Sequence, residues 1–319
     1  MHTFRANAGG EPVGGSVTRV LASDLQTLSA FLAQRFQYET GPFESISDLT
    51  PAKRYLLRTD YNLNNSHKIS FRYNQLDSSS VSNLSGSSSA GLGRATFTTS
   101  FLNFAASNYT VLENIKSGIG EWNWVIGGTM SNNLIAGYTT SNESRGDPGT
   151  LFPFVDILGA GGTAYTSFGT EPFTVNNELR YNTLQIQDNL TRYGNRHSLT
   201  VGGTLQRYES DNSFFSCCPQ SNYVYSSLAD FYTDVNNYAA NPNRTTSPVT
   251  LRRFKLRYSN FPGLEKPLQP LKVWYGGAYA QDASPSPAAS GSTSRISRTR
   301  RTETRRRIRS PSATRPALL

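Results

Sequence analysis

The sequence predicts an all-β protein, an antiparallel meander that forms a partial transmembrane β-barrel with long loops and one or two short loop helices. Three observations predict this fold class. Side-chain character alternates with a period of two, which indicates strands with one apolar and one polar face. The alternating runs are about ten residues long, more than the ~5–6 of a globular strand and close to the ~9–11 of a transmembrane barrel strand. Short Asn- and Ser-rich turns alternate with very long polar loops, as they do in outer-membrane barrels.

The composition agrees with this fold class. Hydrophobic residues make up only 36% of the 319 residues, although the chain has 17 Tyr, 17 Phe and 26 Gly. Low hydropathy with many β-forming residues is expected when only every second side chain meets lipid. The net charge of +9 belongs to the end of the chain, because residues 283–319 hold nine Arg and one Glu. The nearly neutral remainder gives no electrostatic reason to expect a specific nucleic-acid partner.

The chain divides into three predicted parts: a disordered start over 1–15, a partial outer-membrane barrel over 16–282 and a disordered Arg/Ser-rich tail over 283–319. Residues 1–20 contain no basic segment followed by an apolar one, so no secretory signal is expected there. A barrel protein needs export. This pattern therefore predicts that the chain begins inside a longer protein.

Residues 22–36 are the best helix candidate. Ser23 is a suitable N-cap with Gln26 three residues on, the spacing of a capping box. An apolar stripe follows at helical spacing, formed by Leu25, Leu28, Leu32 and Phe36. We expect a short helix packed within an outer loop, with a partner-binding helix as the alternative. Residues 227–238 predict a second capped helix of the same kind.

Residues 52–76 predict the first long hairpin. Two alternating runs flank Asn64–Ser66, a turn whose side chains suit local hydrogen bonds. Two further hairpins follow, one with a predicted turn at Ser131–Asn133 and one with a turn at Tyr193–Asn195. Val273–Asp282 is also strand-like.

If these strands form a membrane barrel, one face meets lipid and the other lines the lumen. The predicted lipid-facing residues are Tyr55, Leu57, Tyr61, Ile69, Phe71, Tyr73, Trp122, Trp124, Leu199, Val201 and Leu205. The predicted lumen-facing residues are Arg54, Arg58, Asp60, Lys68 and Arg72. The alternation alone also fits a secreted soluble all-β protein that binds glycans, built as a sandwich or solenoid. In a sandwich, two apolar faces would meet as a core.

Residues with catalytic or ligating chemistry are few. His2, His67 and His197 are isolated, and Cys217 and Cys218 are adjacent in a predicted loop, so we expect no metal site there. Residues 159–164 (GAGGTA) fit a dinucleotide fingerprint only superficially, because no helical pattern follows them. We therefore expect no enzyme, no cofactor and no metal.

The tail over 283–319 has no aromatic residue and no periodicity. Three interpretations stay open: an Arg/Ser segment that binds RNA or acidic surfaces, a plain disordered tail, or out-of-frame translation of a GC-rich gene. The third is favoured, because the Arg/Ser bias begins at Ala283 directly after a strand-like segment.

Several long segments resemble the barrel of Oar-like TonB-dependent outer-membrane receptors. They are YLLRTDYNLNNSHKISFRYNQLD, EWNWVIGGTMSNNLIAGY, SLADFYTDVNNYAANPNRTTSPVTLRRF and RYSNFPGLEKPLQPLKVWYGGAYAQD. The resemblance covers roughly residues 16–282. It implies a barrel of about 22 strands with a plug and a signal peptide, an outer-membrane location, and TonB-coupled uptake or export-related transport of large substrates.

The chain departs from that family pattern, because no signal, plug or TonB box is recognised in it and the Arg/Ser run replaces the next barrel strand. The resemblance therefore implies an internal barrel fragment that is not competent alone. Its expected partner is outer-membrane lipid, with the TonB system engaged only by a full-length member.

Overall fold

The computed structural model describes residues 4–87, 98–146, 150–214 and 219–284. Its main element is a seven-stranded antiparallel sheet in the order β14-β11-β10-β7-β6-β4-β3. The strands are β3 (Ala52–Asn64), β4 (His67–Ser82), β6 (Tyr109–Ile126), β7 (Met130–Asn142), β10 (Asn177–Tyr193), β11 (Ser198–Phe214) and β14 (Gln269–Ala283). Each long strand pairs with the long strand that precedes or follows it in the chain. The predicted all-β antiparallel meander is therefore confirmed. The sheet is open, with β3 and β14 as its edges.

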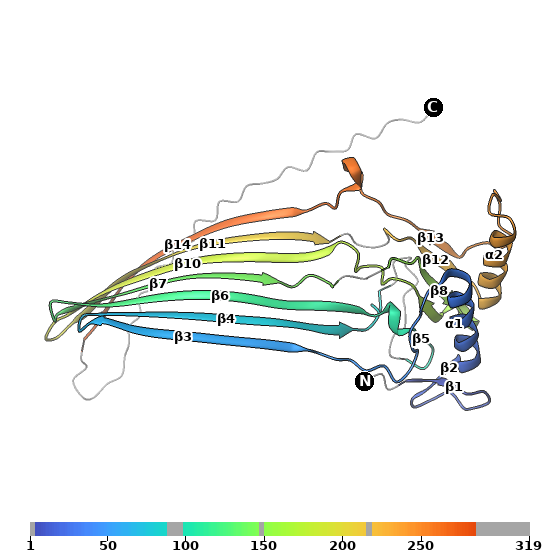
Figure 1. Cartoon of the computed structure of the whole chain (residues 1–319), viewed down its shortest axis with the longest axis horizontal. Helices are drawn as coiled ribbons and strands as arrows, with labels where there is room; N and C mark the ends of the chain where they lie inside the picture. Colours follow the sequence, from blue (N-terminus) through green and yellow to red (C-terminus); the bar gives the residue numbers. More distant parts are fainter. Residues whose placement is uncertain (1–3, 88–97, 147–149, 215–218, 285–319) are drawn as a thin grey trace.

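The two ends of the long sheet differ (Figure 1). Short turns join β3 to β4, β6 to β7 and β10 to β11 at one end. At the other end the long connections fold into a compact unit, which we call the cap. The cap contains a five-stranded sheet of β5 (Leu102–Asn103), β8 (Phe154–Leu158), β9 (Ala164–Phe168), β12 (Asn222–Tyr225) and β13 (Arg253–Lys255). The predicted long polar loops are therefore folded, because their apolar residues find partners far away in the sequence.

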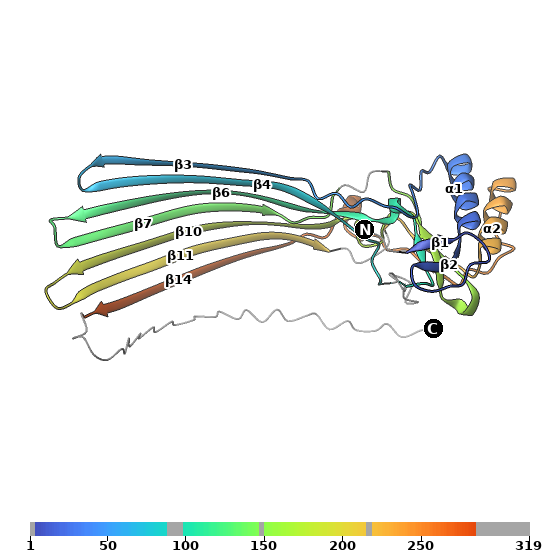
Figure 2. The ribbon, with the colours of Figure 1, turned by 90° about the horizontal axis from the view of Figure 1, so that it is seen from below.

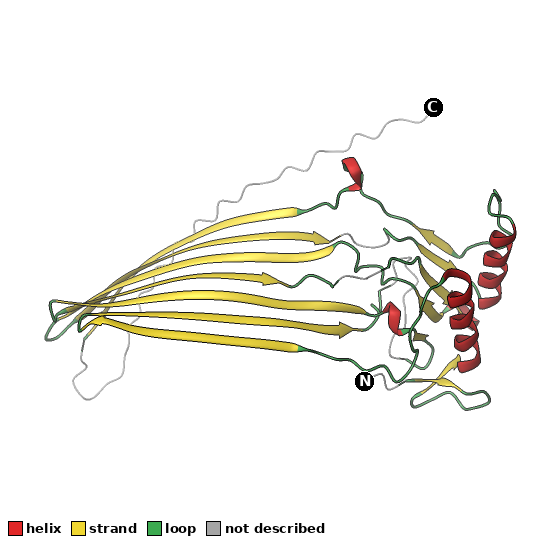
Figure 3. Cartoon of the chain, in the orientation of Figure 1, coloured by secondary structure: helices red, strands yellow, loops and turns green. Residues whose placement is uncertain are grey.

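Two helices complete the cap, α1 (Ala22–Phe36) and α2 (Leu228–Ala240). Both lie at the end of the molecule farthest from the short turns (Figures 2 and 3). The fully buried apolar side chains gather between these helices and the small sheet. They include Val20, Leu25, Leu28, Leu32, Phe104, Ile157, Phe168 and Phe231. The hydrophobic core of the described chain is thus in the cap rather than along the long sheet.

The helix at 227–238 is confirmed with its cap, because the Ser227 hydroxyl accepts a hydrogen bond from the Asp230 backbone N–H at 3.1 Å. The Ser23 cap is wrong. The helix begins at Ala22, and its N-cap position is Leu21, which has no side-chain cap. Strand β2 (Val17–Leu21) runs directly into the helix, so Ser23 already lies in its first turn.

The predicted turn at 64–66 is confirmed, since Asn64 Oδ1 accepts hydrogen bonds from the backbone N–H groups of Ser66 and His67. The turn at Ser131–Asn133 is wrong, because these residues belong to β7. The chain instead reverses at Gly127 and Gly128, with φ of 56° and 72°, values that glycine adopts without a Cβ penalty. The predicted turn at Tyr193–Asn195 is confirmed except for its first residue, because Tyr193 ends β10 and the chain reverses from Gly194.

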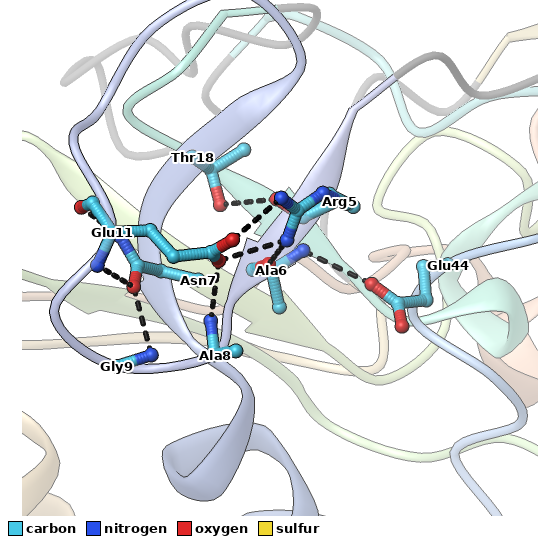
Figure 4. Close-up of polar contacts among 8 residues, drawn as sticks. All are labelled: Arg5, Ala6, Asn7, Ala8, Gly9, Glu11, Thr18 and Glu44. Carbon is cyan, nitrogen blue, oxygen red and sulfur yellow. Dashed lines mark hydrogen bonds and ion pairs between the residues drawn. The ribbon is translucent and has the colours of Figure 1, made fainter.

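The prediction of a disordered start over 1–15 is also wrong for residues 4–15, which the structure describes. Strand β1 (Arg5–Asn7) pairs with β2 in parallel, and a network of polar contacts closes the loop between them (Figure 4). The Arg5 guanidinium donates to both carboxylate oxygens of Glu11, at 2.8 and 2.7 Å. This hydrogen bonding lowers the pKa of Glu11 to about 2. Asn7 Oδ1 accepts from the backbone N–H groups of Gly9 and Glu11. The predicted tail after 284 and residues 1–3 lie outside the described residues.

Candidate functional site

All eleven residues of the predicted lipid-facing set share one face of the long sheet. The pairing register shows this directly: Tyr61 lies opposite Ile69, and Ile69 lies opposite Trp122. The same face continues across the sheet through Leu134, Ala136, Tyr138, Leu184, Ile186, Leu190, Leu199, Val201 and Leu205. We call it the apolar face. Trp274 on β14 also belongs to it, opposite Arg207, so all three Trp of the chain lie there.

Nothing among the described residues covers the apolar face. The side chains of Tyr61, Val201 and Trp274 are 64%, 51% and 61% exposed. In a sandwich this face would meet a second apolar sheet and be buried. The small sheet does not do this, because it belongs to the cap (Figure 1). The arrangement therefore favours an apolar face in contact with lipid over a soluble sandwich.

A row of polar residues bounds the apolar face on the cap side. In register across the sheet it runs through Gln75, Lys116, Thr140, Asn182, Glu209 and Lys272. On the turn side Arg192 and Asp282 flank Leu199 in the same way. Along β10, ten residue steps separate Asn182 from Arg192, about 34 Å at the rise of an antiparallel strand. At a tilt of about 40°, that spans roughly 26 Å of membrane normal, close to the ~25 Å apolar band of outer-membrane barrels.

Aromatic rings gather at the turn end of the apolar face. The rings of Trp122 and Trp124 are parallel within 6° at 5.9 Å, and His67 stacks on both. Trp122 Nε1 also donates to His67 Nδ1 at 3.1 Å. Aromatic girdles mark the interfaces of barrel proteins. His67 is therefore part of an aromatic cluster, whereas the sequence analysis treated it as an isolated histidine.

The predicted lumen-facing set lies on the opposite, polar face. Asp60 accepts from Arg58 Nε at 2.9 Å and from the Ser70 hydroxyl at 2.8 Å, and the Lys68 ammonium is 3.8 Å away. Arg72 lies directly across the strand pair from Arg58. Glu121 on β6 pairs in register with Ser70, which adds a second acidic group. The polar face thus carries both basic and acidic side chains over β3, β4 and β6, and Asp60 pairs with two of the basic ones.

Polar residues also lie on the apolar face, among them Asn132, Asp188 and Arg207, and the sequence analysis did not place Asp188 there. Asp188 lies between Leu134 and Gly203 in register, and its Oδ1 accepts from Asn132 Nδ2 at 2.8 Å. An acidic group on a lipid-facing surface costs free energy, although less than a Lys or Arg at the midplane, which costs about 2–4 kcal/mol. The hydrogen bond from Asn132 satisfies part of this group.

A buried ion pair joins the cap to the sheet. Arg145, just past β7, contacts Glu171 at 2.7 Å, and their side chains are 18% and 1% exposed. The same Glu171 oxygen accepts from the Phe173 N–H and the Thr174 hydroxyl. The Arg145 guanidinium also lies 3.7 Å from the ring centroid of Tyr109, the first residue of β6. These contacts hold the segment that leads into β10 against the cap-side ends of β6 and β7.

The cap contains a cavity of about 410 Å³ between α1, α2 and the small sheet. Its lining is mostly aromatic and includes Phe36, Phe152, Phe168, Tyr223, Tyr225, Phe231 and Tyr238. The polar members of the lining are Asp234 and Arg244, which form an ion pair at 2.5 Å. The Tyr225 hydroxyl donates to the other Asp234 oxygen at 2.7 Å.

These contacts shift two pKa values. Burial, together with the hydrogen bond to Asp234, raises the pKa of Tyr225 well above its usual value. Burial acts to raise the pKa of Asp234, but hydrogen bonds from Ser247, Tyr225 and Arg244 outweigh it and hold that pKa below its usual value. Tyr225 is therefore neutral and Asp234 ionised at neutral pH.

The remaining candidates from the sequence are not brought together. His197 contacts Asp282 at 2.8 Å at the exposed turn end, while His2, Cys217 and Cys218 lie outside the described residues. In residues 159–164 a short 3-10 turn links β8 to β9, with no helix. Among the residues that the structure describes, no cluster of three or more His, Cys, Asp or Glu could hold a metal ion.

No helix in the described part of the chain is long and apolar enough to cross a membrane.

The match to a protein-family model agrees with this geometry. A family model described as "Outer membrane beta barrel domain" matches residues 10–283. The crystal structure of the outer membrane transporter YddB from Escherichia coli is similar to 74% of the chain at 9% identity, with a TM-score of 0.45. The chain spans 25% of that transporter. No curated protein matches.

Proposed function

The chain belongs to the outer-membrane β-barrel domain family, and we propose that it forms part of the wall of an Oar-like TonB-dependent transporter. In this proposal the apolar face contacts lipid, the polar face lines the lumen and the cap lies at the mouth of the barrel. The wall has no catalytic role. The whole transporter takes up or exports a large substrate, and the TonB system acts on it rather than on this chain alone.

The observation that carries the proposal is the continuity of the two faces across seven strands. The apolar face runs without cover from Tyr61 to Trp274, and polar rows bound it at a membrane-like spacing. The polar face holds the charges of Arg58, Asp60 and Lys68 in one network. A sheet of this kind separates lipid from water. The Oar-like identity and the coupling to TonB are supported by the sequence resemblance alone.

Tryptophan quenching by a brominated detergent tests which face meets lipid. The full chain is solubilised in brominated dodecyl maltoside, whose bromines lie in the alkyl tail. Since Trp122, Trp124 and Trp274 all lie on the apolar face, we expect their fluorescence to fall by more than half. The measurement does not require a closed barrel, because detergent covers any exposed apolar face.

A matched pair of variants makes the test specific to the face. With all three Trp replaced by Phe, a single Trp is placed at Leu205 or at Gln206, neighbours on β11 that point to opposite faces. We expect strong quenching for Leu205→Trp and weak quenching for Gln206→Trp. Equal quenching of the two, or the reverse order, would contradict the proposed assignment of the faces.

A further inference from the structure

The cavity in the cap has a size and lining suited to a small ligand. Its volume of about 410 Å³ falls within the ~300–1,000 Å³ of ligand pockets. Phe168 and Phe231 form its buried floor, at 0% and 3% exposure, whereas Phe36 and Tyr238 remain 42% and 54% exposed. It is thus a recess with an aromatic floor and exposed aromatic residues in its lining, positioned by two helices and the small sheet.

The polar side of the cavity can still donate hydrogen bonds. Arg244 Nη1 donates to the Asp234 backbone carbonyl at 3.1 Å and to Asn237 Oδ1 at 2.7 Å, and Nη2 donates to Asp234 Oδ1. Its Nε–H and the second N–H of Nη2 have no acceptor within the described chain. Asp234 is fully engaged by Tyr225, Arg244 and Ser247. An incoming group would therefore meet donors on Arg244 rather than a free carboxylate.

The neighbouring strand adds an aromatic ring beside the cavity lining. β13 pairs with β12, whose Tyr223 lines the cavity. Phe254 in β13 lies opposite Tyr223, and the two rings are 4.9 Å apart. Arg253 and Lys255 alternate with Phe254 and therefore lie on the other face of β13. The group that can receive an anion is thus Arg244, whose planar donors suit a carboxylate.

We propose that the cap cavity binds a small amphipathic carboxylate, with an apolar or aromatic ring among Phe36, Phe152 and Phe231 and its carboxylate on Arg244. This site goes beyond the wall function and does not depend on it, since none of the cavity residues lies on the long sheet. If the chain is also part of a transporter wall, such a site would favour substrates that carry a carboxylate beside an apolar or aromatic ring.

The probe for the test is 4-(trifluoromethyl)benzoate, observed by ¹⁹F NMR line broadening with the full chain in amphipol. 4-(Trifluoromethyl)benzamide is the neutral comparison, and amphipol alone is the blank. We expect the carboxylate to bind at least tenfold more tightly than the amide. Broadening no greater than in the blank would overturn the proposal, as would equal affinity of the two probes.

Variants locate the binding. Val235→Trp fills the cavity and should abolish broadening. Phe36→Ala should weaken both probes about fivefold, whereas the matched Phe261→Ala, 51% exposed outside the cavity, should leave them unchanged. Arg244→Lys keeps the charge beside Asp234 but loses the planar donors, and should weaken binding of the carboxylate probe alone, about tenfold.

Near-ultraviolet circular dichroism of each variant checks that the cap is folded. Unchanged binding in folded Phe36→Ala and Arg244→Lys would overturn the site, whereas the quenching test of the faces would be unaffected.

Discussion

At the scale of single residues, Asp234 is the polar centre of the cap. It accepts hydrogen bonds from a tyrosine, an arginine and a serine while itself largely buried. Removing one partner of a buried ion pair is costly because the other charge stays behind without compensation. The ionisation of Asp234 and the neutrality of Tyr225 are therefore conditions for a stable cap.

These conditions predict a pH window for cap stability. The pKa of Asp234 is lower in the folded cap than in the unfolded chain, so its contribution is complete above about pH 4 and is lost as the pH falls further. The pKa of Tyr225 is raised, so its contribution is complete below about pH 10 and is lost as the pH rises. Calorimetry from pH 3 to 11 should show the melting temperature of the cap falling at both limits.

Two variants separate the limits. Asp234→Asn should lower the melting temperature of the cap at neutral pH and should make that temperature less sensitive to pH below about pH 4. Tyr225→Phe should make the melting temperature less sensitive to pH above about pH 10. Because Glu11 also has a lowered pKa, a residual acid dependence should persist in Asp234→Asn and become smaller when Glu11→Gln is added. If the melting temperature falls equally at low pH in Asp234→Asn and in the parent chain, the ionisation of Asp234 does not stabilise the cap.

At the scale of elements, the pairing of β8 with β9 brings a glycine at the end of β9 against the start of β8. Gly169 directly follows β9 and has φ of +96°, and a Cβ there would overlap the carbonyl oxygen of Pro153. Gly162, in the turn between the same strands, has φ of +70° but open space around it. Gly169→Ala should therefore destabilise the cap by about 3 kcal/mol or more, as strain and overlap add. Gly162→Ala should cost only about 1–2 kcal/mol from strain.

Hydrogen exchange of the β9 amides measures this difference. In Gly169→Ala their protection should fall by a factor of about a hundred or more, and in Gly162→Ala by at most about thirty, since each 1.4 kcal/mol is tenfold. Equal protection in the two variants would show that the cap shifts to accommodate the added methyl group at Gly169.

The elements also show what the sequence could and could not predict. The faces of the long strands follow from alternation alone, because a period of two fixes which side chains share a face. Turn positions were less certain: Ser131–Asn133 are good turn residues, yet the two glycines at 127 and 128 form the turn. The helices of the cap were predicted, but its small sheet could not be. That sheet joins short strands from Leu102 to Lys255, which carry no alternation long enough to detect.

At the scale of the whole molecule, charge is divided between body and tail. The nine Arg of residues 283–319 carry almost all of the net charge, with no aromatic residue to stack on bases. We expect full-length chain to bind a short RNA without sequence preference, and a 1–282 truncation to bind far more weakly. Between roughly 50 and 200 mM salt the affinity should drop about 10³-fold, because it rests on counterion release. Fluorescence anisotropy measures both. Salt-resistant and sequence-selective binding would instead make the tail a specific RNA-binding segment.

Within the part of the chain that the structure describes, the long sheet has two unpaired edges, β3 and β14, which limits what it can do alone. β3 has 13 residues and β14 has 15, and roughly half of the backbone polar groups of an edge strand point away from the sheet. In hydrocarbon each unpaired group costs several kcal/mol, so an open sheet cannot remain in a membrane. Closure of these strands on one another is also disfavoured, because bacterial barrels have an even number of strands and at least eight.

We therefore expect the chain expressed alone to collect in inclusion bodies, since long free edges pair with other copies. Refolded in detergent, it should give trypsin-sensitive oligomers whose electrophoretic mobility does not change on heating. Electrophoresis of heated and unheated samples, with and without trypsin, makes the measurement, and a known closed eight-stranded barrel treated in parallel is the control. A heat-modifiable, trypsin-resistant monomer would contradict this expectation. It would mean that β3 and β14 find each other and that the polar face encloses a small lumen of its own.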